Sequence, residues 1–148
     1  MKKKILLWTL VILWMGLIFY LSSRNSEEST SQSQGIINKT NIVEIYDKDK
    51  NEDEKIETLE TIDKYFRKVA HACVYLVLSV LVCLALREHN IILPNIIVIA
   101  FIICFIYSCS DELHQVYVPG RSGEIRDIFI DNFGCMIGYF LFYLKYKR

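Results

Sequence analysis

Residues 91–109 read IILPNIIVIAFIICFIYSC, and the chain continues with SDELHQ at residues 110–115. The first stretch contains no charged residue, and at about 1.5 Å of helix per residue it is long enough to cross a hydrocarbon layer roughly 30 Å thick. The second stretch places two acids and a histidine directly at the end of that span. The combination predicts a membrane-spanning helix with a polar site at one of its ends.

Three more stretches repeat this apolar pattern. They cover residues 5–21, 69–86 and 128–144, and none is interrupted by the regular polar face that a helix of a soluble bundle carries. The chain of 148 residues is 53% hydrophobic and 23% charged, so its charges are segregated between the apolar runs. We therefore expect a single all-α domain over residues 1–148, an integral membrane bundle of about four transmembrane helices with a polar loop after the first span.

The polar loop covers residues 22–66 and changes character along its length. It is rich in serine, glutamate and charges of both signs, which predicts a solvated and partly disordered segment. From Ile56 onward the apolar residues recur in steps of three and four, which predicts a helix that leads into the second span as an interfacial collar. Residues 35–46 are apolar enough either to lie on the membrane surface or to pack on that helix.

Both ends of the chain are basic, because residues 2–4 are lysines and residues 145–148 include two lysines and an arginine. An even number of spans puts both termini on one side, and the positive-inside rule places that side in the cytoplasm. A basic start before an apolar run is also typical of a signal peptide, but residues 22–24 (Ser-Ser-Arg) offer no clear cleavage site. We expect an uncleaved, multi-pass protein of the cell membrane.

Charge and cysteine content argue against two other classes of protein. The formal net charge is zero and no motif of a nucleic-acid-binding fold is present, so we expect no nucleic-acid partner. The five cysteines all lie in the predicted spans without the paired spacing of a zinc or disulfide framework, which indicates small apolar filler. The partner that the sequence does predict is the lipid bilayer.

The order of the spans brings nearly all polar residues to one face of the membrane. The first and third spans end there, and the second and fourth spans begin there. Because ionisable groups are costly in hydrocarbon, we expect them to turn inward and to mark a functional site. Residues three or four apart share one side of a helix, and this spacing forms one polar stripe in each of three spans. The stripes are Arg67, His71, Tyr75 and Ser79; Cys104, Ser108, Asp111 and Gln115; and Asp127, Asp131, Gly134 and Gly138.

The candidate ligand-binding residues are the ionisable and amide side chains of this face. Each charge has a structural explanation of its own: Asp127 could sit in the first turn of the fourth span, and an arginine could simply pair with Asp111 or Glu112. Gly134 and Gly138 form a small-xxx-small pair, which close helix packing explains without a function. Charge pairing alone does not require so many polar residues on three helices. The candidates are Arg67, His71, Asp111, Glu112, His114, Gln115, Arg121, Arg126, Asp127 and Asp131.

Three motifs on this face resemble the VanZ-like family. They read RKVAH at residues 67–71, SCSDELHQ at residues 108–115 and PGRSGEIRD at residues 119–127, and Asp131 and Gly134 follow. The stretch FYLSS, which begins at Phe19, is similar to the end of that family's first span, so the resemblance covers most of the chain outside the polar loop. One departure is Asp131, where asparagine is expected at least as often.

The resemblance implies a bacterial membrane protein of the cell envelope. The family's name-giving members are linked to resistance against lipid-bearing glycopeptide antibiotics such as teicoplanin. A contribution to that resistance is therefore an expected outcome here, while the chemistry has to come from the residues.

The function that the residues favour is recognition of an anionic cell-wall precursor or lipid head group at the outer membrane face. Arg67, Arg121 and Arg126 would engage its phosphate or carboxylate, because the guanidinium fork suits both groups, and the neighbouring acids would hold the arginines in place. A structural or regulatory subunit, whose polar cluster only joins helices, is an alternative. Interhelical polar contacts average only about 0.6 kcal/mol, which is a weak reason for so many charges.

An acid–base enzyme acting on a lipid-linked envelope substrate is the second alternative. Its catalytic candidates would be His71, Asp111 and His114, with a histidine as general base and Asp111 or Glu112 orienting it. No nucleophile motif surrounds the serines, and Asp-Glu-x-His is not a familiar metal signature. A metal between His71, Asp111 and His114 is chemically conceivable, but the sequence predicts no metal, no cofactor and no recognised catalytic motif.

Overall fold

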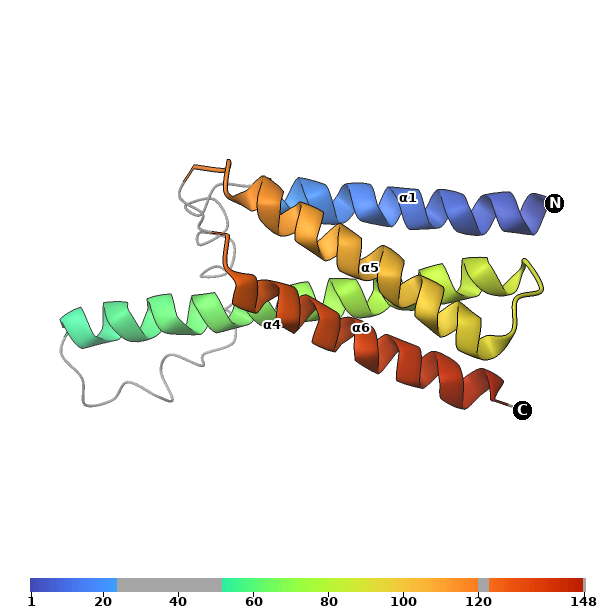
Figure 1. Ribbon diagram of the computed structural model, residues 1–148. Coiled ribbons are helices and arrows are strands. Elements are labelled where there is room, and N and C mark those ends of the chain that lie inside the picture. The colour runs from blue at the N-terminus through green and yellow to red at the C-terminus, as the bar shows by residue number, and fades with distance from the viewer. Residues whose placement is uncertain (24–51, 120–122, 148) are drawn as a thin grey trace.

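The computed structural model describes residues 1–23, 52–119 and 123–147, the side chains of residues 52–60 and 63 excepted. These residues form long α-helices, and no strand occurs among them. Four helices in this part of the chain are long and apolar enough to cross a membrane, which confirms the predicted all-α bundle of four spans. The helices are α1 (Lys2–Ser22), α4 (Glu52–Arg87), α5 (Leu93–Gln115) and α6 (Ile125–Tyr146) (Figure 1).

The ends of the helices differ from the ends of the apolar runs that predicted them. α1 begins at Lys2 and α6 begins at Ile125. Each helix starts three residues before the apolar run that predicted it, because backbone hydrogen bonding is not limited to the apolar run. The third span begins later than predicted, since Ile92 is extended (φ −66°, ψ 145°) and α5 starts at Leu93. Pro94 lies in the first turn of α5, where its missing N–H group costs no helical hydrogen bond.

α4 is the longest of the described helices. It begins before the predicted second span and continues through that span. It begins at Glu52, and its apolar, membrane-spanning part covers Lys64–Arg87. The helix predicted from Ile56 onward is therefore confirmed, and in Figure 1 it protrudes beyond the other helices. The first part of the polar loop, including residues 35–46, lies outside the described residues.

The two ends of the bundle carry different parts of the chain. Figure 1 shows both termini at one end, beside the connection between α4 and α5. Lys3 Nζ lies 2.5 Å from Glu88 Oε1, and the guanidinium of Arg87 lies 3.7 Å from the ring centroid of Tyr146. We call this the terminal end, residues 1–8, 86–94 and 142–147. The opposite end is called the polar end, residues 18–23, 64–75, 108–119 and 123–134.

Close packing of α4 against α6 dominates the interior of the bundle. α4 contacts all three other helices, and its interface with α6 is the most extensive. A Cβ atom on Gly134 would lie 2.8 Å from the carbonyl carbon of Ala72, and one on Gly138 would lie 2.7 Å from the carbonyl oxygen of Leu76. The glycine pair therefore lets the two backbones approach closely, as the small-xxx-small pattern predicted.

The outer surface of the bundle is as apolar as its interior. Ile12, Val98, Ile106 and Phe140 are each more than half exposed, and they belong to three different helices. A soluble monomer rarely exposes an apolar surface of this extent, whereas a lipid bilayer solvates it. The chain is therefore a multi-pass membrane protein.

Candidate functional site

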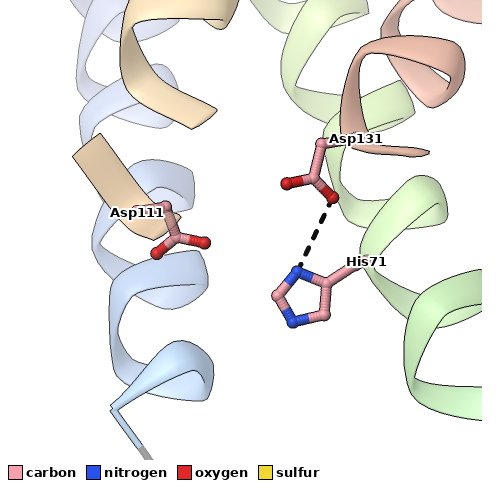
Figure 2. Close-up of side chains that lie close together, drawn as sticks. All are labelled: His71, Asp111 and Asp131. Atoms are coloured by element: carbon pink, nitrogen blue, oxygen red, sulfur yellow. Dashed lines mark ion pairs between the residues drawn. The ribbon is translucent and has the colours of Figure 1, made fainter. Parts of the chain in front are cut away.

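Three ionisable side chains from three helices meet at the polar end. His71 belongs to α4, Asp111 to α5 and Asp131 to α6, and one potential ligand atom of each lies within 4.8 Å of the other two. Figure 2 shows both carboxyl groups and the imidazole ring pointing inward, toward one another. We call His71, Asp111 and Asp131 the central triad. The predicted stripes placed all three residues on the inner sides of their helices.

Asp111 is held in place through one of its two carboxylate oxygens. Ser22 Oγ donates to Asp111 Oδ2 at 2.8 Å, Gln115 Nε2 at 3.3 Å and Tyr75 Oη at 3.4 Å. The side chain is only 2% exposed, and its Oδ1 has no hydrogen-bond partner among the described residues. The three donors thus fix the orientation of the carboxyl group and leave its second oxygen available to a ligand.

Asp131 is buried more completely and has fewer partners. The residue is 0% exposed, and neither carboxylate oxygen has a hydrogen-bond partner within the described part of the chain. Its Oδ1 lies 3.7 Å from His71 Nδ1, which is an ion-pair distance only when the imidazole is protonated. A buried carboxyl group without hydrogen bonds is costly, so folding alone gives no reason for this residue.

Glu112 ties the end of α5 to the start of α6. Its Oε2 accepts a hydrogen bond of 3.0 Å from the backbone N–H of Glu124, the residue directly before α6. The side chain is buried, and its Oε1 has no hydrogen-bond partner among the residues described. Glu112 therefore holds the start of α6 against the end of α5.

A lysine that the candidate set omitted pairs with the first turn of α6. Lys68 Nζ contacts the carboxyl groups of both Asp127 and Glu124, the latter at 3.2 Å, and Lys64 Nζ lies 3.6 Å from Glu124. Asp127 lies in the first helical turn, where the helix dipole favours an anion. The hydrogen bond from Lys68 holds the pKa of Glu124 below its ordinary value of 4.5. The pairing joins α4 to α6 at the polar end.

His114 and Gln115 are neighbours in sequence but serve different contacts. His114 Nε2 lies 3.0 Å from Ser23 Oγ, and its ring stacks on Phe19 with centroids 4.2 Å apart. His114 therefore faces α1, whereas Gln115 faces Asp111. For the acid–base alternative, the acid beside His71 in an ion-pair geometry is Asp131 rather than Asp111 or Glu112.

The three candidate arginines are not equivalent. Arg67 is half-buried on α4 and has an interaction of its own, while Arg126 is exposed on α6. Arg121 lies outside the described residues, so its predicted position over the site stays a prediction. Two lysines of α4 contact acids at the polar end: Lys68 contacts Glu124 and Asp127, and Lys64 contacts Glu124.

Other residues that support the site were not in the candidate set. Tyr75 lies on the predicted stripe of α4, and Ser22 lies in the motif that ends the first span, so a signal was present for both. Asn132 donates to Ser108 Oγ at 3.1 Å, yet it lies beside the stripe of α6 and no sequence pattern marked it. The omission reflects a bias toward ionisable groups, because a hydroxyl that orients an acid has no charge of its own.

The geometry restricts what the central triad can do chemically. One imidazole nitrogen and two carboxylate oxygens at these distances can hold a metal ion or exchange a proton. The His71 side chain is 22% exposed and Asp131 is fully buried, so a ligand would reach the triad past the imidazole.

Comparison with known proteins gives one match. The sequence model of a protein family described as VanZ/LLP1 matches residues 7–146, a range that includes every candidate site residue. No curated protein and no solved structure matches the chain.

Proposed function

The chain belongs to the VanZ/LLP1 family, and on that premise we propose that it binds an anionic cell-wall precursor or lipid head group at its polar end. The proposal places this end at the outer face of the cell membrane and both basic termini in the cytoplasm. A contribution to resistance against teicoplanin-type glycopeptides is the proposed outcome of such binding, as the family resemblance implies.

The layering of charge at the polar end carries the proposal. Acids of α5 and α6 lie buried inside, and basic side chains lie outside them: Lys64 is exposed, and Lys68 and Arg67 are half-buried. A head group approaching from water would therefore meet cations first. Glu124 and Asp127 hold Lys68 in place, which is the orienting role that the sequence assigned to other acids.

A specific contact favours an enzyme as the second candidate. The imidazole of His71 next to the buried carboxyl group of Asp131 is an arrangement that can orient a general base. The site would then act on a lipid-linked envelope substrate. This candidate ranks second because the hydroxyl that lies beside a base, Ser23 Oγ at 3.0 Å from His114 Nε2, does not belong to the His71–Asp131 pair.

Binding is tested with purified protein in nanodiscs, using a polyprenyl pyrophosphate and phosphatidylglycerol as separate probes. We expect Lys68→Gln and Arg67→Lys to weaken binding about tenfold, since a single lost charge-assisted contact is worth roughly 1.4 kcal/mol. Glu88→Gln, at the terminal end, is the matched control and should bind as the wild type does. Equal binding by all four proteins would contradict the proposal.

The role in resistance is tested separately, in cells. Wild type, Asp111→Asn and Lys68→Gln are expressed at equal membrane levels, and susceptibility to teicoplanin is measured beside an empty-vector strain. We expect the wild type alone to lower susceptibility. If all strains, including the empty control, are equally susceptible, the protein does not contribute to resistance.

A further inference from the structure

We infer that the central triad is a binding site for a divalent transition-metal ion, held by the imidazole of His71 and the carboxyl groups of Asp111 and Asp131. The sequence predicted no metal, and the set that was conceivable there contained His114 in place of Asp131; the three ligands come from three different helices and form no local motif. The inference goes beyond the proposed function, since metal binding at the triad does not depend on any head group.

The spacing of the three side chains suits one shared ion. Each offers a ligand atom, and these atoms all lie within 4.8 Å of one another. Ligand atoms about 2.1 Å from one tetrahedral ion lie about 3.4 Å apart, so atoms up to 4.8 Å apart would have to approach one another by about 1.4 Å or less. In Figure 2 the three side chains already point inward, toward one another.

The unused oxygens of the two acids point independently to a ligand. Both oxygens of Asp131 and Oδ1 of Asp111 are buried without a hydrogen-bond partner among the described residues. Buried charges in proteins are normally paired or coordinate a metal. The neighbouring cation Lys68 pairs with Glu124 and Asp127 instead. A divalent ion would neutralise two carboxylates at once.

The surroundings of Asp111 resemble the support that a metal ligand receives. Ligating carboxylates are usually hydrogen-bonded through their other oxygen, which fixes their direction. Asp111 accepts bonds from Ser22, Tyr75 and Gln115 on Oδ2 alone, which leaves Oδ1 to the ion. Side chains of α1, α4 and α5 thus converge on one oxygen of Asp111.

The donor set selects the kind of ion. Carboxylate oxygens suit Mg²⁺, Ca²⁺ and Mn²⁺, whereas imidazole suits Zn²⁺ and other transition metals, so one nitrogen with two oxygens favours Zn²⁺ or Mn²⁺ over Mg²⁺. Three protein ligands leave a further position open on the ion. The side chain of His71 is 22% exposed, so an ion would reach the site past this residue.

The test is direct metal binding to the full-length protein in detergent, purified with a tag that contains no histidine. The protein is stripped with EDTA and dialysed against Zn²⁺, and bound metal is measured by mass spectrometry, with Mn²⁺ binding followed by its paramagnetic resonance spectrum. We expect one ion per chain for the wild type and for the control Glu88→Gln. Asp131→Asn and His71→Gln should each lower the affinity at least tenfold.

Thermal unfolding with and without Zn²⁺ separates lost binding from lost folding. Asp131→Asn keeps the side-chain volume and removes a buried charge, so in EDTA its Tm should equal or exceed that of the wild type. Added Zn²⁺ should raise the Tm of the wild type and leave that of Asp131→Asn unchanged. The inference is overturned if the folded wild type binds neither metal stoichiometrically, or if Asp131→Asn binds as tightly as the wild type.

Discussion

The two ends of the bundle treat charge in opposite ways. At the terminal end, Lys3 pairs with Glu88 while its own side chain is 72% exposed, and Trp8 Nε1 donates to His89 Nε2 at 3.1 Å. At the polar end, Asp111 and Asp131 are buried, and three of their four oxygens have no hydrogen-bond partner within the described residues. Charges that are solvated by water, as at the terminal end, are explained by the end of a membrane span. Buried carboxylate oxygens without a hydrogen-bond partner require another explanation, and we therefore propose that the functional site lies at the polar end.

The largest expected effect tests whether close helix packing maintains the polar end. Gly134→Val would push a side chain into the backbone of Ala72 and should destabilise the protein by about 3 kcal/mol or more. The matched control is Gly16→Val on α1, where a Cβ meets nothing within 4 Å. Folded yield in the membrane and unfolding in detergent measure the difference. Equal yields would mean that α4 and α6 do not pack as described.

The next effect compares an acid from each end. Asp111→Ala leaves Ser22, Tyr75 and Gln115 without their acceptor, so we expect a loss of about 2 to 3 kcal/mol in the free energy of unfolding. Glu88→Ala removes an exposed partner of Lys3 and should cause no measurable change. Denaturant unfolding of both variants gives the comparison. A larger loss for Glu88→Ala would reverse our assignment of the two ends.

A smaller effect uses two hydroxyl groups on the same helix. Ser22 Oγ donates to a buried carboxylate at 2.8 Å, so Ser22→Ala should cost about 1 to 2 kcal/mol. Thr9 Oγ1 donates to the carbonyl oxygen of Ile5 within α1, where the backbone bond remains, and Thr9→Ala should be close to neutral. Thermal unfolding in one detergent compares the two. Equal costs would indicate that α1 does not contribute to the site.

The smallest expected effect concerns the pH dependence of stability. Glu124 at the polar end and Glu88 at the terminal end should respond to pH alike, because both side chains are near water. Hydrogen bonds from Lys68 and Lys3 hold the pKa values of Glu124 and Glu88 below the ordinary 4.5. A lowered pKa stabilises the folded protein above pH 4.5, and this contribution is lost as the pH falls through the lowered value. Lys68→Gln should return the pKa of Glu124 toward 4.5 and leave that of Glu88 unchanged.

Carboxyl-carbon NMR shifts of labelled glutamate follow both titrations in one sample. Lys3→Gln is the reciprocal variant, in which Glu88 should move and Glu124 should not. If neither variant shifts its partner, the two lysines do not form these hydrogen bonds in solution.

The predicted fold agreed with the structure where the signal was local. Four apolar runs became four spans, and the helix from Ile56 proved continuous with the second span. The start of the third span was placed two residues early at Ile91, because hydropathy does not report the extended backbone of Ile92 before Pro94. The glycine pair of α6 also behaved as its spacing predicted, since close approach depends only on the missing side chains.

The structure brings part of the predicted site together and adds pairings that the sequence did not predict. His71, Asp111 and Asp131 lie together at one end, as helical spacing requires. Sequence reasoning linked acids to arginines, whereas the structure links Lys68 to Asp127 and Glu124. Pairings depend on how far each helix is rotated against its neighbours, and no spacing within one helix contains that information.

The sequence by itself determined that this chain crosses a membrane four times and gathers its polar residues at one end, because hydropathy and the helical period are properties of single segments. Only the tertiary structure decided that Asp131 Oδ1 lies 3.7 Å from His71 Nδ1, and that Asp111 accepts its hydrogen bonds through one oxygen alone. These contacts arise where α4, α5 and α6 cross, and helix crossing is set by packing between segments far apart in the chain.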